Sequence, residues 1–305
     1  MRQMSNSSAL NDFLLMPFSD TWELQLLHFL LLLAIYLTAL LGNILIITTV
    51  ACDHHLHTPM HFFLLNLSLP DLGSVSATVP KSMANFLWDT RIISYSGCAA
   101  QDFMFVFLIT AEYYILTLMA YDRFVAICRP SCVKMAAAAW GTGFLHAALH
   151  TANTFSIPLC QGNVVKQFFC EIPQILKLCC SGFSYLREVG TIVVNICLGF
   201  VCFVYIVLSY VQIFRAVLRI PSQQGRRKAF SMCLPHLIVV SLLISTGTFA
   251  YLKPPSISSP CLDLVVAVLY AVVPPAVNPL VYSVRNKELK DALQKLILSI
   301  LFQQQ

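Results

Sequence analysis

Charged side chains are scarce in this chain. Asp, Glu, Lys and Arg make up 11% of its 305 residues, whereas hydrophobic residues make up 58%. Such a composition excludes an ordinary soluble globular protein. The net charge of +5 is modest, and there is no basic tract with interleaved aromatic residues, which excludes a typical nucleic-acid-binding protein.

A cleavable signal peptide is not expected either. The first residues, MRQMSNSSALNDF, contain neither an apolar core nor a cleavage site. The first apolar helix is therefore expected to start membrane insertion itself. The triplet that begins at Asn6 matches the N-glycosylation sequon, which would be used only if this end of the chain faces the lumen.

Long apolar stretches are abundant instead. Stretches of 18 or more residues recur, each able to cross a hydrocarbon core of about 30 Å, and about seven fit with short loops between them. Because backbone groups in lipid must be paired within their own segment, we predict an all-α membrane protein with a bundle of seven transmembrane helices. The chain is expected to form one domain: an N-terminal segment 1–22, a helix bundle 23–285 and a tail 286–305 with a short amphipathic helix over 287–301.

The basic residues are distributed unevenly over this arrangement, in which the fifth helix is expected over 189–218 and the sixth from Lys228. Of the 19 Lys and Arg residues, 12 fall on the side of the C-terminus. We therefore expect the C-terminus in the cytoplasm and the N-terminus outside the cell. The 12 residues are Arg123, Arg129, Lys134, Arg215, Arg219, Arg226, Arg227, Lys228, Arg285, Lys287, Lys290 and Lys295.

Two acidic residues are expected near the middle of the membrane. At 1.5 Å per residue, Asp71 lies about 18 Å into the second helix, and Glu112 lies about 16 Å from Arg123 in the third. Ionisable groups at this depth predict function: a shared proton or a bound cation such as Na⁺, with Asn43 and Asn278 nearby. The alternative, a protonated acid hydrogen-bonded to its neighbours, is equally open for Glu112.

An acid–base pair, Asp122 and Arg123, ends the third apolar segment. Charge at a helix end is tolerated at the lipid–water boundary, so the pair by itself also fits a marker of helix depth. The surrounding sequence, MAYDRFVAICRP over 119–130, resembles the MAYDRYVAIC-x-P signature of odorant (olfactory) receptors, a branch of the rhodopsin-like (class A) G-protein-coupled receptors. Phe124 in place of Tyr is the one departure, and the resemblance favours a functional role for the pair.

Four further motifs carry the same resemblance in the expected order. LHTPMHFFL over 56–64 is similar to LHTPMYFFL, and KAFSMCLPH over 228–236 is similar to KAFSTCxxH. PPAVNPLVY over 274–282 is similar to the PPxxNPxxY ending, and the text over 134–181 also resembles an odorant receptor. The resemblance covers roughly 27–293, and within the odorant receptors the chain is similar to family 14.

The resemblance implies a receptor and not an enzyme. Its partners would be a small, mainly apolar, volatile odorant, a heterotrimeric G protein of the olfactory Gs type that raises cAMP, and the lipid bilayer. It implies a multi-pass protein of the plasma membrane without a cofactor, apart from the Na⁺ considered above. The residues expected to couple or switch are Asp122, Arg123, Tyr210, Lys228, His236, Asn278, Pro279 and Tyr282.

Four cysteines lie in the segments expected outside the cell, where disulfides form. Sequence alone allows three pairings of four cysteines. The resemblance implies Cys98–Cys170 and Cys160–Cys180, with Cys179 as a competing neighbour for the second bond.

A ligand pocket is expected in the outer half of the bundle. Helical spacing puts four residues of the third helix on one inward stripe, and two residues of the sixth helix lie at similar depth. Apolar side chains with a few hydroxyls are typical of small-molecule pockets, although each could instead pack against lipid or another helix. The expected residues are Phe105, Val106, Ile109, Thr110, Thr248 and Tyr251.

Other functions are less well supported. A receptor for amines would carry an acid where this chain has Phe105, although Asp102 lies one turn further out. A helical transporter or channel is disfavoured by the odd helix number and by the lack of an internal repeat or paired broken helices. His146 and His150 share a helix face, but without a third ligand they indicate interhelical hydrogen bonding more than a metal site.

The connection between the third and fourth helices is short. Only 17 positions separate Arg123 from Trp140, whereas in odorant receptors this connection is about ten residues longer. Short turns join helices readily, so we expect a normal bundle with a second inner loop of a few residues. Because that loop normally touches the G protein, we expect weak coupling.

Overall fold

The computed structural model describes residues 12–16, 21–88, 90–125, 129–180, 182–219, 221–252, 260–285 and 287–302. The predicted glycosylation site, Asn6, lies outside these residues. The side chains of Arg123, Lys228 and Tyr251 also lie outside the described part, so their predicted roles stay predictions.

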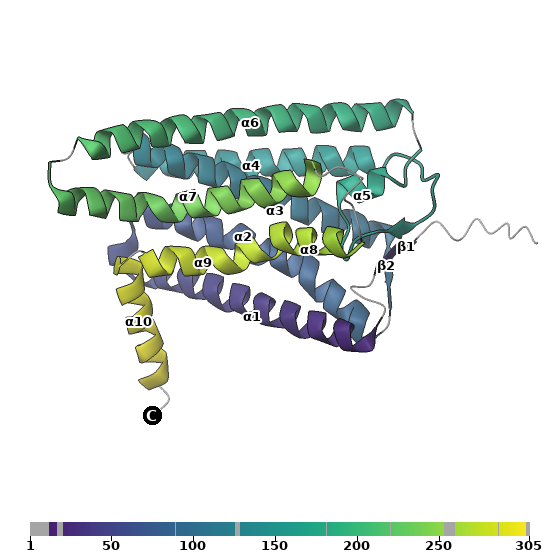
Figure 1. Ribbon diagram of the computed structural model, residues 1–305, viewed down its shortest axis with the longest axis horizontal. Coiled ribbons are helices and arrows are strands. Elements are labelled where there is room, and N and C mark those ends of the chain that lie inside the picture. The colour runs from purple at the N-terminus through teal and green to yellow at the C-terminus, as the bar shows by residue number, and fades with distance from the viewer. Residues whose placement is uncertain are drawn as a thin grey trace, which may run out of the picture.

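Long helices run side by side along one common direction and form the predicted seven-helix bundle (Figure 1). Two consecutive helices, α8 and α9, are bent by 41° at a break of one residue and together make one span. The helices of the bundle are α1 (Trp22–Cys52), α2 (Pro59–Leu87), α3 (Tyr95–Val125), α4 (Arg129–Thr154), α6 (Phe183–Leu218), α7 (Gln223–Leu252), α8 (Pro260–Ala271) and α9 (Val273–Arg285). A 3₁₀ turn, η1 (His54–Leu56), connects α1 to α2.

Within the described residues, α1, α2, α3 and α6 are each long and apolar enough to cross a membrane, and α8 with α9 adds a fifth span. The other two, α4 and α7, are less apolar. Helix α4 is rich in alanine and carries Lys134, His146 and His150, while α7 begins with a basic turn and is apolar over Cys233–Phe249. Large apolar side chains such as Phe200 and Val201 on α6 are exposed, as expected of a surface that faces lipid.

Two predicted helix starts are wrong. The fifth bundle helix, α6, begins at Phe183 and not at 189, and the sixth, α7, begins at Gln223 and not at Lys228. Both helices continue beyond their apolar runs. In α6 the added turn carries Glu188, which is buried and paired with His150 of α4, so tertiary contacts extend the helix where the hydropathy pattern stops.

A small sheet, which the sequence did not predict, closes one end of the bundle. Strand β1 (Asp12–Leu15) lies between β2 (Ile92–Ser94), which is antiparallel to it, and β3 (Val164–Val165), which is parallel to it. The strands are too short for an alternating pattern to stand out, and their backbone groups pair with segments far away in sequence. We call this end of the bundle the sheet end.

The last helix, α10 (Lys287–Phe302), leaves the opposite end of the bundle and runs across the direction of the other helices (Figure 1). Its apolar face, with Leu289 fully buried and Ala292 buried, packs against the core near α1 and α9. The predicted amphipathic tail helix over 287–301 is therefore present. A crosswise amphipathic helix is suited to lying along a membrane surface. We call this end the α10 end.

Candidate functional site

The segment between α4 and α6 covers the sheet end and is fixed there by two disulfides. Cys98 of α3 is bonded to Cys170, and Cys160 to Cys180, with Cα–Cα distances of 5.5 and 5.0 Å. These are the pairs that the family resemblance implied; Cys179 is a buried free thiol. A helix, α5 (Ile172–Leu176), lies within this segment.

Buried hydrogen bonds hold the same segment against the bundle. The Gln101 side chain of α3 accepts from the Cys170 N–H at 2.8 Å and donates to the Ala77 carbonyl of α2 at 2.9 Å. The Ser82 hydroxyl of α2 donates to the Phe168 carbonyl at 2.8 Å. The segment is therefore a fixed wall and not a free loop.

Aromatic rings of this wall and of α8 (Pro260–Ala271) cover the half of α3 nearer the sheet end. The ring centroids of Phe105 and Phe169 are 5.1 Å apart, and those of Phe105 and Tyr270 are 6.1 Å apart. The Tyr270 hydroxyl of α8 donates a short hydrogen bond to the buried carboxyl of Glu171. Burial raises the pKa of the Glu171 carboxyl above its usual range, and the hydrogen bond from Tyr270 opposes this effect.

The predicted ligand residues on α3 lie where three apolar clusters meet. Phe105 belongs to the cluster around α1, α2, α8 and α9, and Ile109 packs against both this cluster and the larger one towards the α10 end. Val106 packs against the cluster under the sheet. Thr110 is half-buried, whereas Thr248 on α7 is exposed. The structure therefore brings the α3 residues to the apolar interior, and Thr248 stays a prediction.

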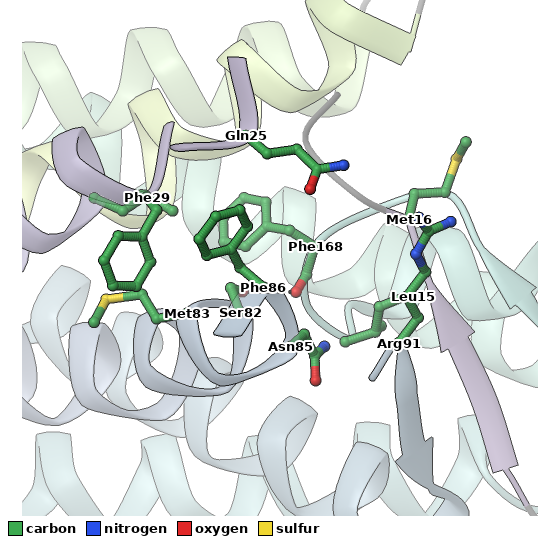
Figure 2. Close-up of a pocket in the computed structure, with 11 residues that line it drawn as sticks. Leu15, Met16, Gln25, Phe29, Ser82, Met83, Asn85, Phe86, Arg91 and Phe168 are labelled. Atoms are coloured by element: carbon green, nitrogen blue, oxygen red, sulfur yellow. Dashed lines mark hydrogen bonds between the residues drawn. The ribbon is translucent and has the colours of Figure 1, made fainter. Parts of the chain in front are cut away.

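Three cavities among the described residues lie away from this stripe. One lies between α1, α2 and the sheet (Figure 2), a second lies near η1 and the start of α4, and a third lies over the segment between α4 and α6. Phe105 is buried, and the rings of Phe169 and Tyr270 pack on it.

The two deep carboxyl groups share one amide. The Asn278 side-chain nitrogen of α9 donates to both Asp71 oxygens at 3.1 and 3.0 Å, and it lies 3.2 Å from a Glu112 oxygen. All three residues are buried, at 1%, 1% and 2% exposure for Asn278, Asp71 and Glu112. The sequence prediction that these residues gather from α2, α3 and α9 agrees with this geometry.

Asn43 and Pro279 join α1 to the same helix. The Asn43 side chain donates to the Pro275 carbonyl of α9 at 2.9 Å. One residue earlier, a Cβ added at Gly42 would lie 2.9 Å from the Cβ of Pro279, so only glycine allows α1 and α9 to approach this closely.

A second polar link, towards the α10 end, ties α3, α6 and α7 together. His236 of α7 contacts the Leu116 carbonyl of α3 through Nε2 at 2.8 Å and the Tyr210 hydroxyl of α6 through Nδ1 at 2.8 Å. Because a carbonyl only accepts, Nε2 carries the proton, and a neutral imidazole then accepts from Tyr210. The link holds these three helices in one packing.

Two further predicted switch residues, Tyr282 and Asp122, lie on α9 and α3. Tyr282 is buried in the same apolar cluster as Tyr210. The Asp122 carboxyl is half-buried at the end of α3 and lies 4.0 Å from the Cys132 sulfur of α4. Sequence reasoning placed Tyr210, His236 and Tyr282 in one switch, but it did not identify the Leu116 carbonyl, because a backbone acceptor has no sequence signal.

Sequence reasoning also missed most of a polar cluster between α4 and α6. His150 is paired with Glu188 and hydrogen-bonded to Asn195, both on α6, so the predicted interhelical hydrogen bonding is confirmed for His150. Asp102, which has no exposed surface, lies near Glu188 and Glu171. Among the described residues, no group of three His, Cys, Asp or Glu side chains could hold a metal ion.

Comparison with known proteins gives consistent matches over nearly the whole chain. The family model described as "Olfactory receptor" matches residues 32–300. Human "Olfactory receptor 14A16" is 47% identical, with 96% of this chain and 98% of that protein covered. Human "Olfactory receptor 14I1" is also 47% identical, with 99% of this chain and 100% of that protein covered.

The alignments also indicate a gap. The alignment to the first relative runs over 304 positions but covers 96% of this 305-residue chain, so about ten of its positions have no counterpart here.

Among solved structures, squid rhodopsin is similar in fold, with a TM-score of 0.62 at 15% identity over 88% of this chain and 83% of that one.

Proposed function

The chain belongs to the olfactory receptor family of G-protein-coupled receptors, and from this premise we propose that it binds small, mainly apolar, volatile odorants and activates a Gs-type G protein that raises cAMP. Members of this family are multi-pass proteins of the plasma membrane and are not enzymes. The observation that carries the ligand class is the apolar surrounding of Phe105, Val106 and Ile109, where three apolar clusters meet.

Two features support the orientation that we propose. Both disulfides lie at the sheet end, which suits the oxidising outside of the cell. Most Lys and Arg residues, including Arg215, Arg226 and Lys290, belong to the α10 end, which suits the cytoplasm. We therefore place the N-terminus outside and the C-terminus inside.

Activation would be a change of helix packing. An odorant shifts the equilibrium only by its difference in affinity between two packings. The link from Leu116 through His236 to Tyr210 is the candidate two-state element, because it is buried and joins the three helices α3, α6 and α7. Breaking it would free α7 to move away from α3 and open a surface for the G protein.

Na⁺ is the candidate cation for the carboxyl pair. Hard cations prefer oxygen ligands, and Asp71 and Glu112 present carboxyl oxygens to one point, while the Asn43 and Asn278 side-chain oxygens nearby are buried without hydrogen bonds to the described residues. Asp71→Asn should change the sodium dependence of the odorant response. Unchanged dose–response curves and unchanged sodium sensitivity at equal surface expression would make Asp71 structural only.

Coupling is expected to be weak because of the short second inner loop. Helix α3 ends at Val125 and α4 begins at Arg129, and the unmatched positions in the alignment to the first relative are about as many as the predicted deletion. A turn this short cannot lay a side chain into a groove of the G protein. Inserting about ten residues of family-like composition between Pro130 and Cys132 should raise odorant-driven cAMP without changing odorant affinity.

The test of the whole proposal is a cAMP assay of cells expressing the chain, challenged with an odorant panel and stained for surface receptor. The native chain and the chain with the lengthened loop are compared at equal surface expression. A response of the lengthened chain alone supports both parts of the proposal, whereas equal responses contradict the loop argument. No odorant response from either chain, together with odorant-gated ion flux in a bilayer, would favour a channel instead.

A further inference from the structure

A cavity at the sheet end, between α1, α2 and the sheet, lies apart from the predicted odorant residues. It is lined by apolar side chains and a few polar ones (Figure 2). The rings of Phe29, Phe86 and Phe168 lie together on one side of it, and Arg91, next to β2, lies on the sheet side. We propose that this cavity binds a small organic carboxylate, with the carboxylate on Arg91 and the apolar part among the three rings.

The charge of the lining supports an anion. Arg91 is the only charged residue among the described residues that line the cavity, and Arg presents only donors, in a fork that matches a carboxylate. Within the described part of the chain, the Arg91 side chain has no ion pair. Arg91 is exposed and lines a cavity without a described acidic residue, so its side chain is available to a ligand.

Two amide side chains are among the other polar groups of the lining. Gln25 of α1 and Asn85 of α2 both line the cavity, and the Asn85 side-chain oxygen is buried without a hydrogen bond to the described residues. An amide with an unpaired buried end gains from a polar ligand group, and rotation of the amide would bring its NH₂ group to the same place. The cavity therefore has one cation and the Asn85 amide to hold an anion.

The sheet fixes Arg91 at this position. The Leu15 N–H of β1 donates to the Arg91 carbonyl at 2.8 Å, and Leu15 and Met16 also line the cavity. The Ser82 hydroxyl, by contrast, already donates to the Phe168 carbonyl and serves to hold the wall. The backbone that carries the Arg91 side chain is thus fixed by a hydrogen bond to β1.

The size of the cavity limits the ligand. The cavity is partly open, and the space in it for water-sized groups is about 50 Å³. One such group needs roughly 10–15 Å³ on the same measure, so only a few fit inside. We therefore assign the site to short-chain monocarboxylates, whose chain end contacts Phe29 and Phe86. These two rings stack on each other with centroids 5.1 Å apart.

The site touches the wall of the predicted odorant site. Phe168 lines the cavity, and its ring centroid lies 4.8 Å from that of Phe169, which packs on Phe105. A carboxylate bound here therefore contacts the same segment that covers the centre of the bundle.

Direct binding to the full chain tests the proposal without depending on the proposed signalling. The receptor is placed in nanodiscs of zwitterionic lipid at pH 7, and the binding of pentanoate, pentanamide and 1-pentanol is measured by saturation-transfer NMR. Pentanoate should bind at least about tenfold more tightly than its two uncharged analogues. Equal binding of all three, or no binding of pentanoate, would overturn the assignment.

Two variants and a matched control locate the site. Arg91→Gln should weaken pentanoate binding about tenfold or more, Arg91→Lys should weaken it less, and Arg187→Gln, an exposed arginine outside the cavity on α6, should leave it unchanged. Phe86→Ala should reduce the preference for pentanoate over acetate while acetate still binds, which also shows that the variant is folded. Pentanoate binding that is unaffected by Arg91→Gln refutes the site.

Discussion

The Asn278 side chain contacts both deep carboxyl groups, so a single substitution there tests the polar contacts between the helices most directly. In the described part of the chain, it is the only hydrogen-bond donor to either the Asp71 or the Glu112 carboxyl. Replacing Asn278 with Leu keeps a similar volume but leaves two buried carboxyl groups without a donor. We therefore expect the variant to fold, with a clear loss of stability.

The size of the loss follows from two limits. An unsatisfied buried polar group costs about 1–3 kcal/mol in water-soluble proteins, whereas hydrogen bonds between membrane helices average about 0.6 kcal/mol. For the two carboxyl groups together, we expect a loss of roughly 2 kcal/mol in the free energy of unfolding, which lies between these limits. At about 2–4 °C per kcal/mol, this loss lowers the melting temperature by roughly 4–8 °C.

The assay uses the protein's own thiols. Cys132, Cys179 and Cys233 are buried and do not belong to either disulfide, so a thiol-reactive dye reports unfolding of the purified receptor in detergent. Thr38→Val is the matched control, because the exposed Thr38 hydroxyl bonds only to the Ala34 carbonyl of its own helix. A melting temperature for Asn278→Leu that equals that of the control would refute the reasoning.

A charge exchange strengthens the test. Asn278→Asp alone puts three carboxyl groups together without a donor, whereas Asn278→Asp combined with Asp71→Asn restores an amide opposite a carboxyl. The double variant should recover part of the loss seen in Asn278→Asp. Strictly additive losses would show that the two residues do not interact.

Three further predictions concern the other contacts of the site. Tyr210→Phe removes the hydroxyl that contacts His236 at 2.8 Å but keeps the ring. If the link holds the inactive packing, that packing loses about 1 kcal/mol of stability and basal cAMP should rise about fivefold; unchanged or lower basal cAMP at equal surface staining contradicts this. Cys98→Ser removes a crosslink between residues 72 apart, worth about 2–5 kcal/mol, and should leave the receptor inside the cell; a free Cys98 thiol in non-reduced peptides of the native chain would contradict the premise. Burial raises the pKa of the Glu171 carboxyl, so the folded state favours its protonated form, and the stability that this form contributes is lost as the pH rises above the usual value of 4.5. Between pH 5 and about pH 8, the melting temperature of Glu171→Gln should therefore fall less than that of the native chain, and parallel pH profiles would refute this.

The sequence by itself determined the fold class and the family. Apolar stretches of spanning length leave few alternatives in lipid, because the backbone of each must be paired within its own helix. The motifs around Arg123, His236 and Asn278 then specified which bundle it is. Helical spacing and depth were enough to bring Asp71 and Glu112 to one level, since both follow from the rise per residue.

Tertiary structure alone decided how the sheet end is built. The pairing of β1 with β2 and β3, the position of Arg91 beside the cavity, and the packing of Phe169 on Phe105 all join segments far apart in sequence. The acceptor that Leu116 offers to His236 is a backbone carbonyl, identical in every residue type. Such contacts depend on which distant segments meet in the folded protein, and local patterns of hydropathy or spacing do not predict them.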